Sequence, residues 1–271
     1  MMNSSDNCIW LLLIFRLVLT ANMQGFVNVQ GFVSTAVGHN QRSFTTALMS
    51  VGKPALSATP ILALVTEPDA NHHVSRTLEV IRKVLAHNVI QLICIRLNPE
   101  KQQQITVNEL CLGVRNLVNQ NNQDICKLKC YVVLNLNAIE NDLQMAIKCK
   151  LDGVHVKERH REWIHRIRSD WKSDNIIIGT SCHNIDSAKE AASHDPDYLF
   201  VGTCFQTESH PDKSVEDLEG PELPGKVQRA LVSIPCLAIG GINDSNCDIP
   251  VRLGAQGETL NLMQFYIDCC V

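Results

Sequence analysis

Short apolar segments recur along the chain after residue 60, and longer segments with helical periodicity separate them. The apolar segments are rich in Val, Ile and Leu and alternate little with polar residues, which is typical of strands buried on both faces of a parallel sheet. We therefore predict seven parallel strands, over Ile61–Thr66, Val89–Ile95, Leu128–Leu134, Gly153–Val156, Asn175–Gly179, Tyr198–Gly202 and Cys236–Ile239.

A helix is expected after each of these strands, near residues 74–87, 103–119, 138–149, 158–170, 184–194, 219–232 and 244–253. Asn184 can cap the fifth helix, and Asp244 or Ser245 the seventh. Seven strand–helix units favour an α/β fold of the (β/α)8 TIM-barrel type. A doubly wound open sheet has the same alternation and is the alternative, but no G-x-G-x-x-G sequence follows the first strand to support dinucleotide binding.

The eighth unit of such a barrel is hard to recognise in the sequence. Residues 258–271 lack the expected apolar strand of small residues and the closing helix. We expect a short helix or a poor strand here, and so an atypical or incomplete eighth strand unit. An incomplete unit would leave an open seam between the seventh and first strands, and exposed strand edges promote association.

The N-terminal segment differs from the rest of the chain in charge. Residues 7–66 contain no Asp or Glu, whereas residues 61–271 hold 27 of the 28 acidic residues. A signal-like apolar stretch within 1–21 precedes a stretch over 22–58 that is rich in Ser, Thr and Gly, the composition of a transit peptide. This pattern resembles the two-part presequences of proteins imported into complex plastids. We predict a presequence over 1–58, a barrel over 59–271 and a plastid location; the alternatives are a disordered N-terminus, a membrane anchor, another organelle or the cytosol.

Composition excludes several classes of function. A hydrophobic content of 45% is enough for a packed core. The acidic excess after residue 60 argues against nucleic-acid binding, and no segment there approaches 18 consecutive apolar residues, so we expect no membrane span in the body. The twelve cysteines include no C-x-x-C pair and no zinc-site spacing, which favours free thiols in a reducing compartment.

Polar clusters follow the fifth, sixth and seventh strands, and the carboxyl ends of barrel strands are where active sites form. These clusters contain Ser181 and His183, then Thr207, Ser209 and His210, then Gly240–Gly241. Two glycines before a helix N-terminus present backbone N–H groups to an anion, and nearby hydroxyls add further donors. The glycines and the hydroxyls of Thr207 and Ser209 could together form a phosphate cradle at this end of the barrel, whereas any single hydroxyl alone is better explained by a helix cap or a turn.

The same segments resemble one family. The sequences DGVHV at 152–156, IGTSCH at 178–183 and IPCLAIGGIN at 234–243, together with residues 197–212, are similar in order and spacing to the thiamine phosphate synthase and TenI-like family. The resemblance covers residues 128–257 and, more loosely, 61–127. It implies a (β/α)8 barrel that handles thiazole phosphate. Synthases of this family use Mg²⁺ to join hydroxymethylpyrimidine pyrophosphate to thiazole phosphate, and TenI-like members include a thiazole tautomerase that needs no metal.

On the thiazole-phosphate side, the resemblance assigns phosphate contacts to Thr207 and Ser209, which match a T-x-T motif, and to Gly240 and Gly241. His210 stands where the synthases have a lysine. Ser181 and His183 match an S-x-H motif, which implies a pyrophosphate contact for Ser181 in a synthase and a proton shuttle for His183 in a tautomerase.

The pyrophosphate side keeps fewer of the family's residues. Arg96 is what remains of an Arg-Glu-Lys group after the second strand, and Asn135 is what remains of an Asn-Asp metal pair after the third. Glu158, near the end of the fourth strand, could replace a lost metal ligand. Without two carboxylates, Mg²⁺ would be held mainly by substrate and water.

Three functions therefore stay open: a Mg²⁺-dependent synthase, a metal-independent tautomerase, and a non-catalytic barrel that binds a phosphate ligand. We expect an enzyme of thiamine biosynthesis whose partners are small phosphorylated thiazole and pyrimidine substrates, with a homo-oligomer possible in principle. Because the resemblance stops at Gly257, we also expect residues 258–271 to derive from an unusual splice form or from an error in the gene's exon assignment.

Overall fold

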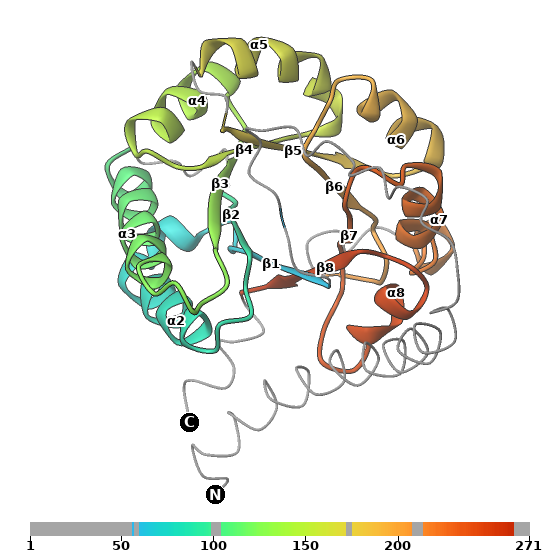
Figure 1. Cartoon of the computed structure of the whole chain (residues 1–271), viewed down its shortest axis with the longest axis horizontal. Coiled ribbons are helices and arrows are strands. Elements are labelled where there is room, and N and C mark those ends of the chain that lie inside the picture. The colour runs from blue at the N-terminus through green and yellow to red at the C-terminus, as the bar shows by residue number, and fades with distance from the viewer. Residues whose placement is uncertain (1–55, 57–59, 99–103, 172–174, 208–213, 263–271) are drawn as a thin grey trace, which may run out of the picture. The chain divides into compact units, whose positions relative to one another are not determined.

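The computed structural model describes residue 56 and residues 60–98, 104–171, 175–207 and 214–262. The predicted presequence thus lies almost wholly outside the described residues. Eight parallel strands close into a barrel in the order β1 to β8, and the helices form a ring around it (Figure 1). The strands are β1 (Ile61–Val65), β2 (Leu92–Ile95), β3 (Tyr131–Asn135), β4 (Gly153–Val156), β5 (Ile177–Cys182), β6 (Tyr198–Val201), β7 (Cys236–Ala238) and β8 (Gly257–Asn261). The predicted (β/α)8 barrel is confirmed, and the doubly wound alternative is excluded.

The helices that surround the barrel follow the predicted segments. They are α2 (Val74–Ala86), α3 (Gln104–Asn122), α4 (Ile139–Lys148), α5 (Ile164–Asp170), α6 (Ile185–Ala192), α7 (Leu223–Ala230) and α8 (Asp248–Arg252), with the 3-10 helices η1 (Ala70–His72), η3 (Glu158–Trp163) and η4 (Val215–Asp217). Asn184 caps α6 as predicted, because its side chain accepts the N–H of Ser187. This cap fixes the start of α6 directly after the cluster at the end of β5.

The predicted cap of the last helix is wrong. The helix α8 begins only after Cys247, whose side chain makes no cap bond. Ser245 instead donates from both its backbone N–H and its hydroxyl to the Asn243 side chain. This local turn uses up the groups that would have capped a helix near residue 244.

Alternate residues of each strand face the barrel interior or the surrounding helices. The interior holds a cluster of buried side chains, made of Ile61, Ala63, Val65, Leu92, Cys94, Tyr131, Val133, Ile177, Tyr198, Phe200 and Leu237. A second cluster lies outside the sheet, between β5, β6 and β7 and the helices α6 and α7. Because the inward positions recur every second residue, the polar residues just beyond the interior cluster line the mouth of the barrel.

The eighth strand forms, contrary to the expected open seam. Gly257–Asn261 pairs with β1 along its whole length, and its first two residues pair with β7. Gly257 permits this approach, because a Cβ there would lie 2.1 Å from the carbonyl oxygen of Ile61. The expected open seam between the seventh and first strands is therefore wrong. The helix that would complete the eighth unit falls on residues outside the described part of the chain.

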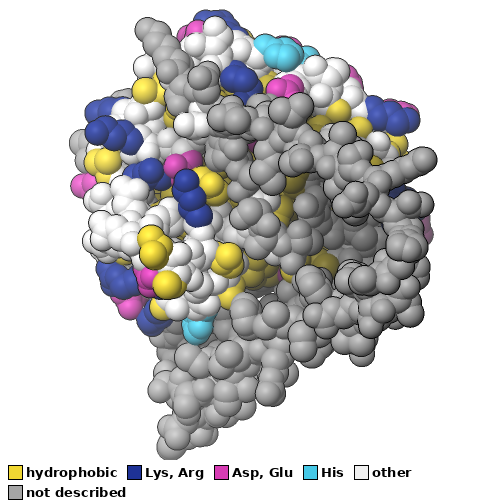
Figure 2. Space-filling view, in the orientation of Figure 1, with side chains coloured by type: hydrophobic (Ala, Val, Ile, Leu, Met, Phe, Trp, Pro, Cys, Tyr) yellow, Lys and Arg dark blue, Asp and Glu magenta, His cyan; other side chains and the backbone are white. Residues whose placement is uncertain are grey.

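The surface charges, the described helices and the thiols can be compared with what the composition predicted. Positive and negative side chains are interspersed around the periphery of the face shown in Figure 2. Among the described helices, none combines the length and the apolar character needed to cross a bilayer. The nine cysteines of the described residues are free thiols, and all except Cys126 are buried.

Candidate active site

Polar side chains from β2, β3, β4 and β5 converge at the carboxyl end of the barrel. The register pairs Asn135 with His155 and places Ser181 two residues beyond the partner of His155. Since Cys94 and Val133 face the interior, the alternation also turns Arg96 and Asn135 inward. Four inward positions of neighbouring strands thus form one polar layer above the hydrophobic interior, and Arg96, Asn135 and Ser181 were all predicted from the sequence.

His155 links Ser181 to the barrel interior. Its Nε2 lies 2.8 Å from the Ser181 hydroxyl, and its Nδ1 lies 3.1 Å from the Tyr198 hydroxyl. The imidazole stacks on Phe200, with ring centroids 4.5 Å apart. Burial lowers the pKa of His155 to about 3, so the ring is neutral at physiological pH.

The direction of these two hydrogen bonds follows from the buried phenol. Burial raises the pKa of Tyr198, so its O–H keeps its proton, and His155 is the hydrogen-bond partner described for it. A buried hydroxyl donates where it can, which makes Tyr198 the donor to Nδ1. A neutral imidazole then carries its proton on Nε2 and donates to the Ser181 oxygen. The Ser181 O–H is left to donate to a bound ligand, as expected for a group that contacts an anion rather than for a base-activated nucleophile.

His183 lies at the rim of the mouth between two carboxylates. Its Nε2 is 3.5 Å from Glu158 and its Nδ1 is 3.5 Å from Glu219, while 47% of its side chain is exposed. Glu219 also accepts the backbone N–H of Thr203 at 2.7 Å, which anchors the loop before α7 against the end of β6. An imidazole flanked on both nitrogens by carboxylates can pass a proton between them, so the position suits proton transfer.

The turn after β7 lies against the loop after β6. Gly240 and Gly241 have φ values of 97° and 64°, a region that favours glycine. A Cβ on Gly241 would lie 2.3 Å from the carbonyl oxygen of Gln206, and Phe205 donates its N–H to the carbonyl oxygen of Gly240 at 3.0 Å. The structure therefore brings the two glycines next to the segment that leads to Thr207.

At this phosphate side, the structure leaves the predicted contacts of Ser209 and His210 untested and contradicts the predicted helix N-terminus after the glycines. Thr207 is the last described residue of its loop, and Ser209 and His210 lie outside the described residues. The expected helix N-terminus does not follow the glycines directly, because α8 begins at Asp248. An anion at this turn would meet backbone N–H groups of the glycine segment without a helix end behind them.

A cationic group that sequence reasoning missed lies on the opposite side of the mouth. Lys157, just beyond β4, donates to the Asn137 side chain at 2.6 Å, and Asn137 donates to the carbonyl oxygen of Leu97 at 2.8 Å. Burial, followed by the nearby charges of Arg159 and Arg96, lowers the pKa of Lys157. Burial also lowers the pKa of Arg96. The position of Lys157, two residues after the inward-facing His155, was the signal that could have revealed it.

The residues predicted for a metal do not form a metal site. Within the described residues, no group of three or more His, Cys, Asp or Glu side chains is placed to hold a metal ion. The Glu158 carboxylate contacts Arg161 at 3.3 Å and faces His183. The Oδ1 of Asn135 is buried and has no hydrogen-bond partner in the described structure, which leaves one acceptor for a bound ligand. The donor set described here does not fit Mg²⁺ held by the protein alone.

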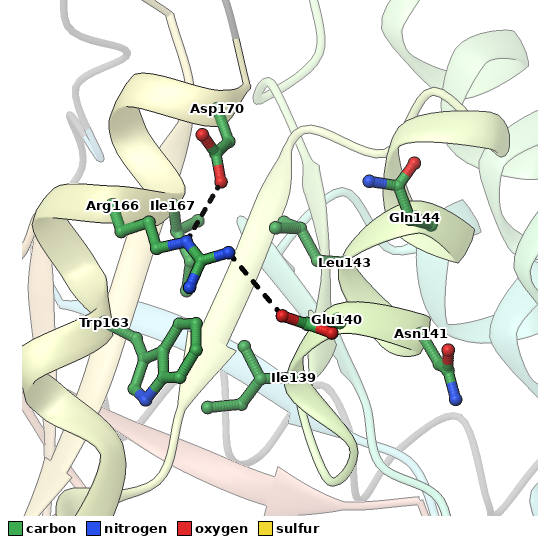
Figure 3. A pocket seen from close by; sticks show the side chains of 9 residues that line it. All are labelled: Ile139, Glu140, Asn141, Leu143, Gln144, Trp163, Arg166, Ile167 and Asp170. Carbon is green, nitrogen blue, oxygen red and sulfur yellow. Dashed lines mark ion pairs between the residues drawn. The ribbon is translucent and has the colours of Figure 1, made fainter.

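A cavity of about 350 Å³ lies outside the barrel, between α4 and α5 (Figure 3). Arg166 lies beside it, paired with Glu140 and Asp170 at 3.5 Å each and placed over the Trp163 ring at 4.6 Å. Its lining side chains come from the helical layer and not from the strand ends. This cavity is therefore separate from the candidate active site.

The comparison with known proteins identifies the family. The family model described as thiamine monophosphate synthase matches residues 62–260. The chain belongs to the thiamine monophosphate synthase family. The match extends past Gly257 into β8, so the expectation that family similarity stops at Gly257 is wrong.

Curated members of the thiamine monophosphate synthase family align with part of the chain. The chain is 34% identical over 122 residues to the thiamine-phosphate synthase of Geobacillus kaustophilus (strain HTA426). This alignment covers 45% of the chain and 53% of that protein. The chain is also 35% identical over 136 residues to the thiamine-phosphate synthase of Coprothermobacter proteolyticus (strain ATCC 35245 / DSM 5265 / OCM 4 / BT), covering 50% and 59% respectively. The chain thus spans about half the length of the curated relatives it matches.

A solved structure agrees with the barrel fold of this family member. Thiamine phosphate pyrophosphorylase from Pyrococcus furiosus superposes with a TM-score of 0.58 at 22% sequence identity, covering 74% of this chain and 85% of that one. At this identity the likeness concerns the fold alone. The contacts at the mouth of the barrel therefore have to support the function by themselves.

Proposed function

We propose that this barrel is a thiamine phosphate synthase, which joins hydroxymethylpyrimidine pyrophosphate to thiazole phosphate and releases pyrophosphate. The observation that carries the proposal is the cationic group at the mouth, where Arg96 and Lys157 lie near enough for their charges to interact. Asp142 is an acidic residue that acts on Lys157, and a pyrophosphate leaving group would supply further negative charge to this group of cations. The Ser181 O–H, left free by the His155 bond, adds a neutral donor on the same side.

In this mechanism the two anionic groups occupy opposite sides of the mouth. Arg96, Lys157 and Ser181 bind the pyrophosphate and stabilise the charge that grows on it as its bond to the pyrimidine methylene breaks. The Gly240–Gly241 turn and Thr207 hold the thiazole phosphate, which orients the thiazole nitrogen toward that methylene carbon. Mg²⁺ is the family's cofactor for the pyrophosphate, and here we propose that it depends on the substrate's oxygens, since the described residues do not form a site for it.

A metal-independent thiazole tautomerase is the second candidate. It is favoured by one observation, the position of His183 between Glu158 and Glu219 at the rim. Moving a proton within a bound thiazole requires a group that can accept and release a proton and an anchor for the phosphate; here the His183 imidazole and the Gly240–Gly241 turn would fill these roles.

One assay separates the candidates. The full chain is incubated with both synthase substrates, or with the carboxythiazole phosphate alone, in the presence of Mg²⁺ or EDTA. Thiamine phosphate formed only with Mg²⁺, and reduced in Lys157→Met but not in the matched surface variant Lys189→Met, supports the synthase. Conversion of the thiazole in EDTA that is lost in His183→Ala supports the tautomerase. Thiazole phosphate binding without turnover would contradict both and favour a binding barrel.

We also propose that residues 1–58 direct the protein to a plastid. Support comes from their two-part composition, in which Asp6 is the one acidic residue, since these residues are almost all outside the described structure. A fluorescent protein fused after residue 58 tests this. Fluorescence confined to plastids is expected, and a diffuse cytosolic signal would overturn the proposal.

A further inference from the structure

One face of α3 contacts the turn that follows α4. Asn108, Cys111 and Arg115 lie three and four residues apart, which places them on one side of the helix. The Cys149 sulfur lies 3.6 Å from the Asn108 side-chain oxygen, and Arg115 forms an ion pair with Asp152. Cys111 lies on α3 between these two contacts, and its thiol is close enough to that of Cys149 for the two to interact.

Backbone hydrogen bonds fix the turn that carries Cys149. Lys150 donates its N–H to the carbonyl oxygen of Ile147, and Leu151 donates to that of Ala146, each at 3.0 Å. This pattern closes the end of α4 and requires a left-handed residue, which is Lys150 with a φ of 53°. The Cys149 sulfur is thereby held toward α3 rather than free to turn into solvent.

The Cys149 thiol differs chemically from the other buried thiols of the described residues. The neighbouring Cys111 thiol lowers the pKa of Cys149 despite its burial, and the charge of Lys148 acts in the same direction. The Cys149 thiol and burial raise the pKa of Cys111. Burial raises the pKa to about 12 at Cys94, Cys182, Cys204, Cys236 and Cys247. Since the thiolate is the nucleophile, Cys149 is the attacking member of this pair and Cys111 the resolving member.

We propose that Cys111 and Cys149 form a reversible dithiol–disulfide pair that reacts with a low-molecular-weight disulfide such as oxidised glutathione. The Cys149 thiolate attacks one sulfur of the reagent, so a mixed disulfide forms and one glutathione thiolate leaves. The Cys111 sulfur then attacks Cys149 and expels the second glutathione. The two protein thiols lose two electrons and two protons, which the two released glutathione molecules carry.

The position of the pair suits a reagent that enters by local unwinding. Cys149 is 1% exposed, but it is the C-cap residue directly after α4 and lies between the exposed Lys148 and Lys150. Opening one helical turn therefore exposes its sulfur, and helix ends open at low cost in free energy. Cys111 lies in the middle of α3 and is reached only after Cys149 has reacted. The disulfide would tie α3 to the segment that enters β4.

Peptide mapping tests the proposal. The folded full chain is incubated with oxidised glutathione, its remaining thiols are blocked, and it is digested and analysed by mass spectrometry without reduction. We expect a peptide containing Cys111 linked to one containing Cys149, reversed by dithiothreitol. A wild-type chain that yields no such linked peptide overturns the proposal, whether or not any variant folds.

Variants assign the order of the steps. In Cys111→Ser, Cys149 should stop at the mixed disulfide and keep one glutathione, whereas Cys149→Ser should leave Cys111 unmodified. Cys247→Ser is the matched control, because Cys247 is buried with a raised pKa, and it should leave the linked peptide unchanged. Glutathione found on Cys111 in the Cys149→Ser variant would contradict Cys149 as the attacking thiol.

Discussion

Replacing Glu258 by Gln should stabilise the barrel, and by an amount that grows with pH. Glu258 is 1% exposed on β8, and neither of its carboxylate oxygens has a hydrogen-bond partner in the described structure. Its register partner Leu62 alternates with the inward-facing Ile61 and Ala63, so Glu258 points out of the barrel. Burial and then the nearby Asp248 raise its pKa from 4.5 to about 8.

The raised pKa sets the size and sign of the effect. Between pH 4.5 and 8 the folded chain keeps a proton on Glu258 that the unfolded chain releases, so the free energy of unfolding falls as pH rises. The full difference corresponds to about 5 kcal/mol, because one pKa unit is worth about 1.4 kcal/mol. Between pH 5.5 and 9, the difference in the free energy of unfolding between Glu258→Gln and the wild type should grow by about 3 kcal/mol in favour of the variant.

Urea unfolding of both chains at pH 5.5 and pH 9 measures this difference directly. Taking the difference between the two chains removes the pH dependence of all other groups, including His155, whose lowered pKa acts in the opposite direction below pH 6.5. Glu216→Gln, at an exposed position, is the control and should show no pH-dependent difference. An advantage of Glu258→Gln that is the same at both pH values would refute the reasoning.

Three further substitutions test the packing and the site. Gly153→Ala places a Cβ 1.8 Å from the Ile177 carbonyl oxygen, so the free energy of unfolding in urea should fall by about 3 kcal/mol; an unchanged value would contradict the close approach of β4 and β5. Tyr198→Phe removes the donor to His155 Nδ1 and should lower kcat about tenfold with little change in KM, measured as thiamine phosphate formation; an unchanged kcat would show that the tautomer of His155 does not matter. Gly241→Ala, at a φ of 64°, should raise the KM for thiazole phosphate about tenfold. A rise in the KM for the pyrimidine substrate instead would contradict the assignment of this turn to the thiazole phosphate.

The barrel was predictable because its strands are buried on both faces. Runs such as Tyr131–Asn135 contain few polar residues, so the strands are visible without knowledge of their partners. The eighth strand was misread because Glu258 and Asn261 interrupt its apolar character. What supports that strand is its pairing with β1, which is nearly two hundred residues away in the chain and leaves no local signal.

The sequence indicated individual residues of the site but not the contacts between them. Motif positions indicated Ser181, because polar residues after a strand end fall at the mouth of a barrel. Its hydrogen bond to His155 joins two strands, and the cationic group containing Lys157 depends on which residues of neighbouring strands share an inward position. Such contacts follow from register and closure, which composition and spacing along one chain do not specify.

Titration calorimetry with two ligands tests most directly whether the mouth holds two phosphate groups on opposite sides. Pyrophosphate and thiazole phosphate are each titrated into the wild type, Lys157→Met and Gly241→Ala. We expect Lys157→Met to weaken pyrophosphate binding about a hundredfold and to leave thiazole phosphate binding unchanged, with the reverse pattern for Gly241→Ala. If both substitutions weaken the binding of the same ligand, or if neither weakens the binding of either ligand, the division of the site into two anion-binding sides is contradicted.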